Sequence, residues 1–207
     1  EEILDAVECL IGPDIVLTNT VLFIKEPNSL HHVTYHQDAT YMGLEPQNSL
    51  TAWIALTKST CENGCVRMIR GSHLSDIQQH IDTFGEDNIL TRGQQIENVD
   101  EKCALDIKLE PGQMSLHHAR TIHGSRPNKT NERRIGIALQ SFAHPSTRQV
   151  HGEDYALLVR GCDDYGNFTK GPRPNAEVDL ANVAFRNKVN VRLSEILYAG
   201  AEKQRGY

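Results

Sequence analysis

This sequence lacks the cysteine spacing of the common cysteine-based scaffolds. The 207 residues contain five cysteines, an odd number, and no two of them form a CxxC pair. A disulfide framework is therefore not expected, and Cys61 and Cys65 are too far apart to form half of a zinc knuckle. We expect five free thiols in a reducing compartment, which predicts a cytoplasmic location. These thiols are Cys9, Cys61, Cys65, Cys103 and Cys162.

Long apolar runs are also absent, and basic residues are fewer than acidic ones. No apolar segment approaches the roughly 18 residues that a membrane-spanning helix needs, so a membrane is not an expected partner. The 27 acidic residues outnumber the 21 basic ones, which gives a formal net charge of -6. Nucleic acid is not expected either, because phosphate binding needs a concentrated basic surface. A small-molecule substrate remains compatible with this charge, since one buried arginine can bind an anion.

The residues that are present predict one domain with a β-rich centre and helical ends. No internal repeat divides the chain, so we expect a single domain over residues 1–207. β-Branched and apolar residues predict strands at 15–24, 31–36, 50–57, 65–69, 104–109, 113–118 and 134–143. Apolar periodicity predicts helices at 1–11 and 177–199 and a short helix near 75–83.

Turn residues separate these short strands. Asn63-Gly64 and Pro111-Gly112 predict turns between neighbouring strands. Short strands framed by helices indicate an all-β core, either a β-sandwich or a jelly roll. The mouth of such a fold brings together side chains that lie far apart in sequence. The polar segment 74–102 is expected to form either a lid over that mouth or a surface excursion.

The densest chemical signal is the segment Tyr35-His36-Gln37-Asp38. Residues i and i+2 of a strand project to the same side, so His36 and Asp38 can direct an imidazole and a carboxylate at one point. A second histidine would complete the two-histidine, one-carboxylate triad of non-haem iron oxygenases, which leaves coordination positions open. An HxD pair alone is weak evidence, because such a pair is more often a surface hydrogen bond.

The third ligand is expected within residues 117–123, which contain three histidines. His123 is preferred because Gly124 permits a close backbone approach and Ser125 adds a polar group. His117 and His118 remain alternatives, although they end an apolar strand, where packing or hydrogen bonding is the more common role.

Six short blocks in a fixed order give these residues a context. They are His36-Gln37-Asp38, Thr51-Ala52-Trp53-Ile54-Ala55-Leu56, Asn63-Gly64-Cys65, Gly71-Ser72-His73, Pro111-Gly112 and His123-Gly124-Ser125, followed by Arg134. This succession, from about Val21 to about Ala143, resembles the phytanoyl-CoA dioxygenase family. The resemblance implies a double-stranded β-helix, a cupin-like jelly roll with flanking α-helices. It also implies Fe(II) as the metal, 2-oxoglutarate as cosubstrate and dioxygen as oxidant.

The resemblance further implies a role for each site residue. The implied metal ligands are His36, Asp38 and His123, and the implied cofactor-binding residues are Arg134, Ser125, Trp53 and Gln37. The far carboxylate of 2-oxoglutarate would be buried and would need a charge partner. Arg134 can supply two parallel N–H donors and Ser125 a hydroxyl. Arg133 would point to the opposite side of the strand, so a shift of one residue would exchange the two arginines.

The implied activity is hydroxylation of an unactivated C–H bond in a small-molecule metabolite, with release of succinate and CO2. Asp38 fills the coordination site that halide takes in related halogenases, so hydroxylation is preferred to halogenation. Desaturation, epoxidation and ring formation (cyclisation) use the same iron and stay open as alternatives. A zinc hydrolase with the same ligands is a second hypothesis, although no HExxH motif supports it. A non-catalytic jelly-roll module that binds a metal or ligand is a third.

Two properties are not specified by these motifs. No feature selects the substrate, and none indicates the oligomeric state. Members of the family usually have more chain before the position of Val21, so we expect this domain to lack part of the usual N-terminal region.

Overall fold

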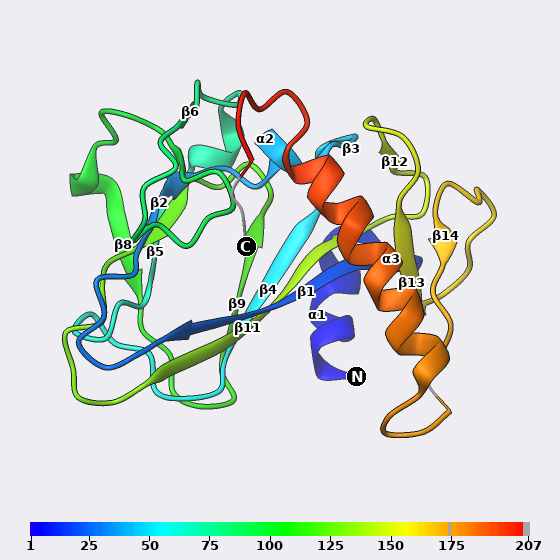
Figure 1. Ribbon diagram of the computed structural model, residues 1–207, viewed down its shortest axis with the longest axis horizontal. Helices are drawn as coiled ribbons and strands as arrows, with labels where there is room; N and C mark the ends of the chain where they lie inside the picture. Colours follow the sequence, from blue (N-terminus) through cyan, green and yellow to red (C-terminus); the bar gives the residue numbers. More distant parts are fainter. Residues whose placement is uncertain (174, 205–207) are drawn as a thin grey trace.

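Two β-sheets form the centre of the protein, shown by a computed structural model that describes residues 1–173 and 175–204 (Figure 1). The larger sheet has six strands in the order β14-β13-β1-β11-β4-β9, and the smaller has four in the order β2-β10-β5-β8. The six strands are β1 (Ile15–Lys25), β4 (Leu50–Ala55), β9 (Met114–His118), β11 (Arg134–Ala143), β13 (Tyr155–Arg160) and β14 (Thr169–Lys170). The four are β2 (Val33–His36), β5 (Val66–Ile69), β8 (Ala104–Ile107) and β10 (His123–Ser125).

Helices and short two-stranded pairs surround this centre. The helices are α1 (Glu2–Ile11), α2 (Ala39–Met42) and α3 (Leu180–Leu197). The paired short strands are β3 (Leu44–Glu45) with β12 (Arg148–Gln149), and β6 (Ile81–Asp82) with β7 (Gln94–Gln95). Single 3-10 turns occur at Ser72–Leu74 and Glu101–Cys103. All seven predicted strands and both terminal helices are confirmed, with ends that differ by a few residues at most.

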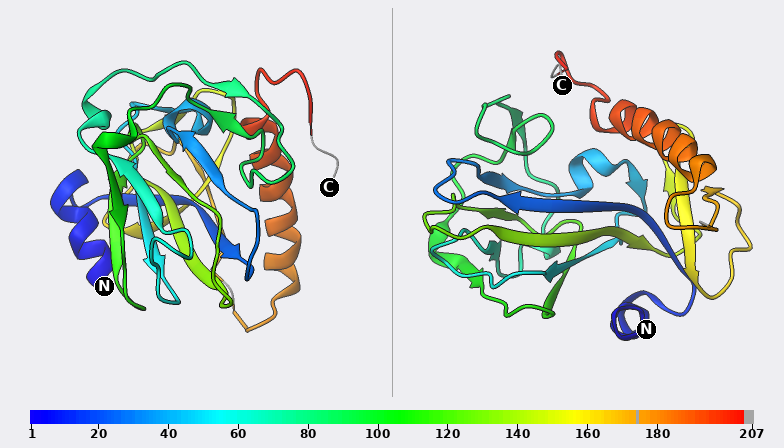
Figure 2. Two further views of the ribbon diagram at one scale, coloured as in Figure 1. Left: turned by 90° about the vertical axis from the view of Figure 1, so that its left-hand side faces the viewer. Right: turned by 60° about the horizontal axis from the view of Figure 1, so that its bottom comes forward.

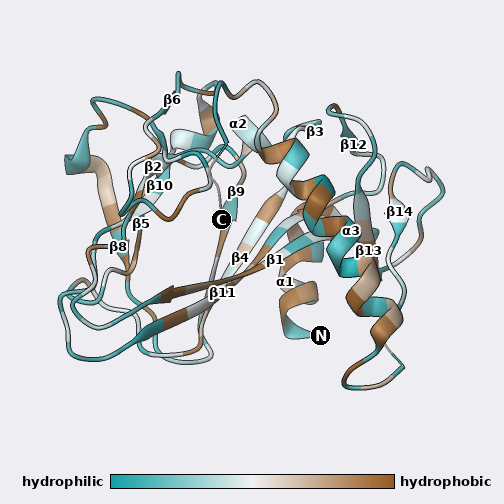
Figure 3. Cartoon of the chain, in the orientation of Figure 1, coloured by the Kyte–Doolittle hydropathy of each residue, from teal (hydrophilic) through white to brown (hydrophobic). Residues whose placement is uncertain are grey.

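The two sheets pack against each other through apolar side chains. Trp53 and Ala138 of the larger sheet form one buried cluster with Val66 and Met68 of the smaller sheet. The hydropathy colouring of Figure 3 shows much of β1 and β11 as apolar, as expected for strands that cross the molecule. Along β11, buried and half-buried residues alternate up to Gln140, so one face of the strand points between the sheets.

The terminal helices lie on opposite sides of the strands (Figure 2). On the side of α1, Val7 packs with Leu50 and Phe142 of the larger sheet. The third helix begins after Asp179, whose carboxylate accepts hydrogen bonds from the N–H groups of Ala181 and Asn182 and so caps the helix. None of the helices in the described residues is long and apolar enough to cross a membrane.

Both predicted turns form, but neither joins paired strands. The segment around Asn63-Gly64 leads from β4 to β5, and that around Pro111-Gly112 leads from β8 to β9. In each case the two strands belong to different sheets. These turns therefore carry the chain across the sandwich instead of closing a hairpin.

The predicted helix near 75–83 is wrong, and the segment 74–102 packs along β2. The N–H of Gln78 donates to Oε1 of Gln37 (2.8 Å) and not to a carbonyl one helical turn earlier. Further along, the N–H of Ile96 donates to the carbonyl of Tyr35 (2.8 Å). The segment thus covers the β2 edge of the smaller sheet. An uncovered sheet edge can pair with a strand of another chain, and this cover prevents such pairing.

Candidate metal centre

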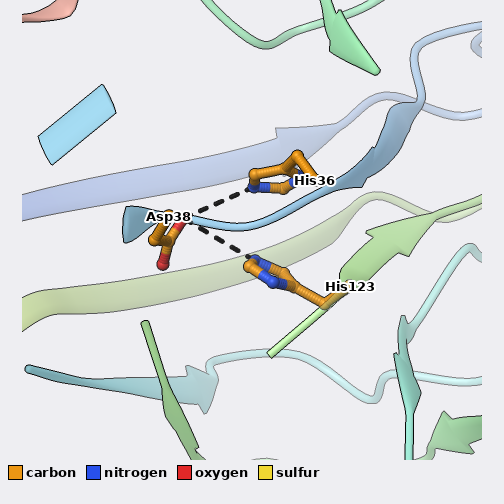
Figure 4. A group of neighbouring side chains, drawn as sticks. All are labelled: His36, Asp38 and His123. Carbon is orange, nitrogen blue, oxygen red and sulfur yellow. Dashed lines mark ion pairs between the residues drawn. The ribbon is translucent and has the colours of Figure 1, made fainter. Parts of the chain in front are cut away.

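Three side chains expected to bind a metal come together at one end of the smaller sheet. His36 ends β2 and His123 begins β10, and these two residues are direct partners in the antiparallel pair. Asp38 follows two residues after the first histidine. The ligand atoms of the three residues lie within 4.8 Å of one another, and Figure 4 shows both imidazoles turned toward the carboxylate. Strand pairing therefore creates the convergence that the spacing of residues 36 and 38 alone only suggested.

Backbone carbonyls fix the orientation of both imidazoles. Nδ1 of His36 donates to the carbonyl of Thr34 (2.9 Å), and Nδ1 of His123 donates to that of Thr121 (2.9 Å). A carbonyl accepts only, so each Nδ1 carries the hydrogen and each Nε2 keeps a free lone pair. The two Nε2 atoms lie 3.4 and 3.9 Å from Oδ1 of Asp38. Outer hydrogen bonds of this kind set the tautomer that a metal requires.

The carboxylate of Asp38 is buried and ionised. Burial by itself raises its pKa, but the neighbouring histidines, His123 foremost, outweigh burial in the acidic range where His123 is protonated, and they hold the pKa well below its usual range. Tyr41 donates to Oδ1 (2.9 Å) and Thr51 to Oδ2 (3.2 Å). Burial lowers the pKa of His123 to about 3, so this imidazole is neutral at physiological pH and can bind a metal.

The strand argument for Asp38 was only partly correct. β2 ends at His36, and Asp38 has helical backbone angles (φ -57°, ψ -37°) at the start of α2. The carboxylate still reaches the imidazoles because the chain turns inward there. A two-residue spacing places both groups at the site, but through a strand-to-helix junction instead of a continuous strand.

Three of the residues expected to bind the cosubstrate line the same pocket as the three candidate metal ligands. These are Trp53, Ser125 and Arg134, all buried. The guanidinium carbon of Arg134 lies 5.1 Å from the centre of the Trp53 ring. Nη2 of Arg134 donates to the carbonyl of Gly64 (3.0 Å), while Nε and Nη1 have no partner within the described residues. An arginine with free buried donors suits an anionic ligand. By contrast, Arg133 is exposed and forms an ion pair with Glu26.

Gln37 lies elsewhere than expected. Its side chain is fully buried but does not line this pocket. Its Nε2 donates to the carbonyl of Arg120 (2.7 Å), and its Oε1 accepts from the N–H of Gln78. Gln37 sits between two candidate ligands that face the pocket, so its own side chain points away from the pocket and holds the neighbouring loops. The expected contact with the cosubstrate therefore has no support in the structure.

Two further residues, His117 and Lys25, lie near the pocket, and only His117 was predicted from the sequence as a possible ligand. His117, an alternative ligand in the sequence, has Nε2 3.9 Å from Oδ2 of Asp38, and both ring nitrogens lack a hydrogen-bond partner within the described residues. It is not part of the group whose ligand atoms lie within 4.8 Å. Lys25 was not among the residues predicted from the sequence. It lies two positions after Phe23 on β1, so both side chains project to the same side of the strand, and Phe23 lines the pocket. Strand parity was the available signal.

A second cluster of possible ligands is less suited to a metal. The ligand atoms of Cys61, Cys65 and Asp106 also lie within 4.8 Å of one another. Burial raises the pKa of Cys65 to about 12, so its thiol keeps its proton, whereas a metal needs the thiolate. All five cysteines are free thiols, as expected.

The donor set of the first cluster fits a non-haem iron. Two imidazoles and one carboxylate converge from one side of a pocket, which is the facial arrangement of iron oxygenases. Structural zinc sites are closed by four protein ligands, and three are found here. The free donors of Arg134 lie in the same pocket and match a cosubstrate with a second carboxylate.

Comparison with known proteins agrees with this geometry. The profile of phytanoyl-CoA dioxygenase (PhyH) matches residues 1–136. Peroxisomal phytanoyl-CoA dioxygenase of Bos taurus is 32% identical over 142 residues, which cover 66% of this chain and 42% of that protein. A probable alpha-ketoglutarate-dependent hypophosphite dioxygenase of Stutzerimonas stutzeri is 28% identical over 81% of this chain and 56% of its own length. The chain thus spans about half the length of the curated relatives it matches.

Solved structures show the same fold. The apo form of ThoJ, a non-haem monooxygenase, has a TM-score of 0.84 and 37% identity over 95% of this chain and 72% of its own. EvdO2 from Micromonospora carbonacea var. aurantiaca, complexed with 2-oxoglutarate, has a TM-score of 0.56 and 28% identity over 65% of this chain and 54% of its own. These findings confirm the predicted jelly roll and support Fe(II), 2-oxoglutarate and dioxygen as the cofactor set. The chain belongs to the phytanoyl-CoA dioxygenase family.

Proposed function

We propose that this protein is an Fe(II)- and 2-oxoglutarate-dependent dioxygenase that hydroxylates an unactivated C–H bond of a small-molecule metabolite. One observation carries the proposal: the triad His36, Asp38 and His123 shares a pocket with a buried arginine that has free donors. When bound, iron and 2-oxoglutarate together supply the activation of dioxygen, with succinate and CO2 as co-products. Family membership supports the same class of reaction.

The chain's own residues bind the metal, orient the 2-oxo acid and shield the pocket from water. The triad holds the metal from one side, so the remaining positions face the pocket. Arg134 and Ser125 bind the far carboxylate of the 2-oxo acid, and the ring of Trp53 packs over the guanidinium. Burial of these groups excludes water, which strengthens each charge interaction.

Hydroxylation is preferred over halogenation because Asp38 is present and faces both histidines. A carboxylate in this position occupies the coordination site that a halide would need. We also propose a reducing, cytoplasmic location, because all five cysteines are free and four of them are exposed.

Binding and turnover with defined reagents test this proposal. 2-Oxoglutarate should bind at least tenfold more tightly with Fe(II) than without it under anaerobic conditions, since a chelating cosubstrate contacts the metal. In air, succinate should form only when both are supplied, and Asp38→Ala should abolish it. Asp164→Ala, at an exposed acidic position, serves as the matched control. Metal-independent 2-oxoglutarate binding and no succinate formation would exclude the assignment.

The type of oxidation is tested on the product. A substrate found by stimulated succinate release should gain one oxygen atom, detected by mass spectrometry with labelled dioxygen. Loss of two hydrogens without added oxygen would instead identify desaturation or ring closure.

A further inference from the structure

Two buried cations lie side by side at the cosubstrate pocket, and one of them, Arg134, lines it. Lys25 ends β1 and Arg134 begins β11, and the two residues are direct partners in the antiparallel pair. Directly opposite residues project to the same face, so both side chains point between the sheets. Lys25 is fully buried, and the arginine is 2% exposed. Within the described residues, the hydrogen bonds of both cations go to neutral oxygens, of a serine hydroxyl and of main-chain carbonyls.

Two buried positive charges side by side are energetically unfavourable when no anion is nearby. Burial, and then the charge of Arg134, lower the pKa of Lys25 to about 7. Burial also lowers the pKa of Arg134 to about 10. Positive charge at this place is therefore disfavoured in the ligand-free protein, and a bound carboxylate would favour it.

Lys25 reaches the pocket through Ser125. Its Nζ donates to Oγ of Ser125 (2.7 Å) and also to the carbonyl of Arg126. An ammonium group only donates, so the hydroxyl oxygen accepts this bond and its own hydrogen is directed away from the lysine. Ser125 lines the pocket together with Arg134 and the metal ligands, whereas Lys25 does not.

We propose that Lys25 is a positioning residue for the far carboxylate of the 2-oxo acid, acting through Ser125. It orients the hydroxyl as a donor into the pocket and places a second positive charge behind it. The pocket thereby selects a 2-oxo acid with two carboxylates over one that ends in a methyl group. This inference rests on the proposed function, since it concerns the cosubstrate of the same site.

A structural role is the competing explanation. The side chain of Lys25 also ties β1 to the segment after β10, because its Nζ donates to the main-chain carbonyl of Arg126. If the lysine only held this segment, its loss would weaken all ligands of the pocket alike. Selectivity between two ligands that differ in one carboxylate separates the two roles.

The experiment compares 2-oxoglutarate with 2-oxovalerate in the full chain loaded with Fe(II) under anaerobic conditions. Both have five carbons, but 2-oxovalerate ends in a methyl group. Trp53, the single tryptophan of the chain, lies against Arg134 and provides a fluorescence signal, with calorimetry as a second readout. Lys25→Met should raise the Kd of 2-oxoglutarate by about 10- to 100-fold, the range of one lost charge-assisted hydrogen bond. The Kd of 2-oxovalerate should change less than about twofold.

Three further variants complete the test. Lys58→Met, at an exposed lysine paired with Glu110, should leave both constants unchanged. Ser125→Ala should cause the same selective loss, and the double variant should lose little more, because the lysine acts through the serine. Lys25→Gln, which keeps a donor without the charge, should lie between parent and Lys25→Met, and it replaces the methionine variant if that one does not fold.

The outcomes distinguish the two proposals. If the parent binds no 2-oxoglutarate, the proposed function fails and Lys25 has no carboxylate to position. If the parent binds 2-oxoglutarate but Lys25→Met weakens the binding of both ligands equally, or of neither, only the role proposed for Lys25 is overturned.

Discussion

Replacing Arg134 with methionine should change the ligand-free and the ligand-bound protein in opposite directions. The pKa of Arg134 falls to about 10 from the ordinary 12.5, chiefly through burial. A difference of that size corresponds to about 3 kcal/mol against the charged form. Removing the charge relieves this cost but also loses the hydrogen bond to Gly64 and the contact with Trp53, worth about 1–2 kcal/mol together. The free energy of unfolding of the ligand-free protein should therefore rise by about 1–2 kcal/mol.

The same substitution should remove most of the affinity for 2-oxoglutarate. Two charge-assisted hydrogen bonds contribute about 3–6 kcal/mol, and the remaining Lys25 compensates in part. We expect a loss of at least about 100-fold in 2-oxoglutarate binding, with Fe(II) binding nearly unchanged. The parent at 100 times its Kd gains about 2.7 kcal/mol of stability from the ligand, and the variant should gain almost none.

Urea unfolding with and without 2-oxoglutarate measures both effects. Arg133→Met is the matched control, since its exposed ion pair with Glu26 should contribute no more than about 0.5 kcal/mol. The reasoning is refuted if Arg134→Met unfolds several kcal/mol more easily while 2-oxoglutarate still protects it as well as the parent.

Three other predictions follow from the site. Tyr41→Phe removes the 2.9 Å hydrogen bond to Asp38 and should weaken Fe(II) binding by about 10- to 100-fold, measured by anaerobic titration; unchanged affinity would show that this bond is dispensable. His117→Phe should keep the affinity for Fe(II) and raise the free energy of unfolding by about 1–3 kcal/mol, because it removes two buried nitrogens that have no hydrogen-bond partner within the described residues. His123→Phe, by contrast, should abolish Fe(II) binding. The affinity for 2-oxoglutarate should fall as pH rises above about 7, by up to about tenfold per pH unit, because Lys25 must take up a proton when the carboxylate binds. Calorimetry from pH 6 to 9 in buffers of different ionisation enthalpy tests this, and a flat profile would contradict it.

Local patterns in the chain were sufficient for much of the architecture. β-Branched runs identified the strands because a strand needs only alternation and a buried face, which are visible in a few residues. The ordered blocks around His36, His123 and Arg134 identified the candidate ligands. Strand parity placed Arg134 and Arg133 on opposite sides, and the structure buries Arg134 and exposes Arg133. The short helix near 75–83 failed because Gln37, far from it in sequence, takes up the N–H of Gln78.

The remaining features depend on which strands become neighbours, and no local pattern contains that information. The pairing of β2 with β10 sets the two imidazoles opposite each other, and the pairing of β1 with β11 sets Lys25 beside Arg134. Whether a buried polar atom has a partner is a property of the assembled molecule, because its partners come from distant segments. The sequence could therefore name the candidate metal ligands, whereas the second cation and the contacts of Gln37 emerge when the two sheets close on each other.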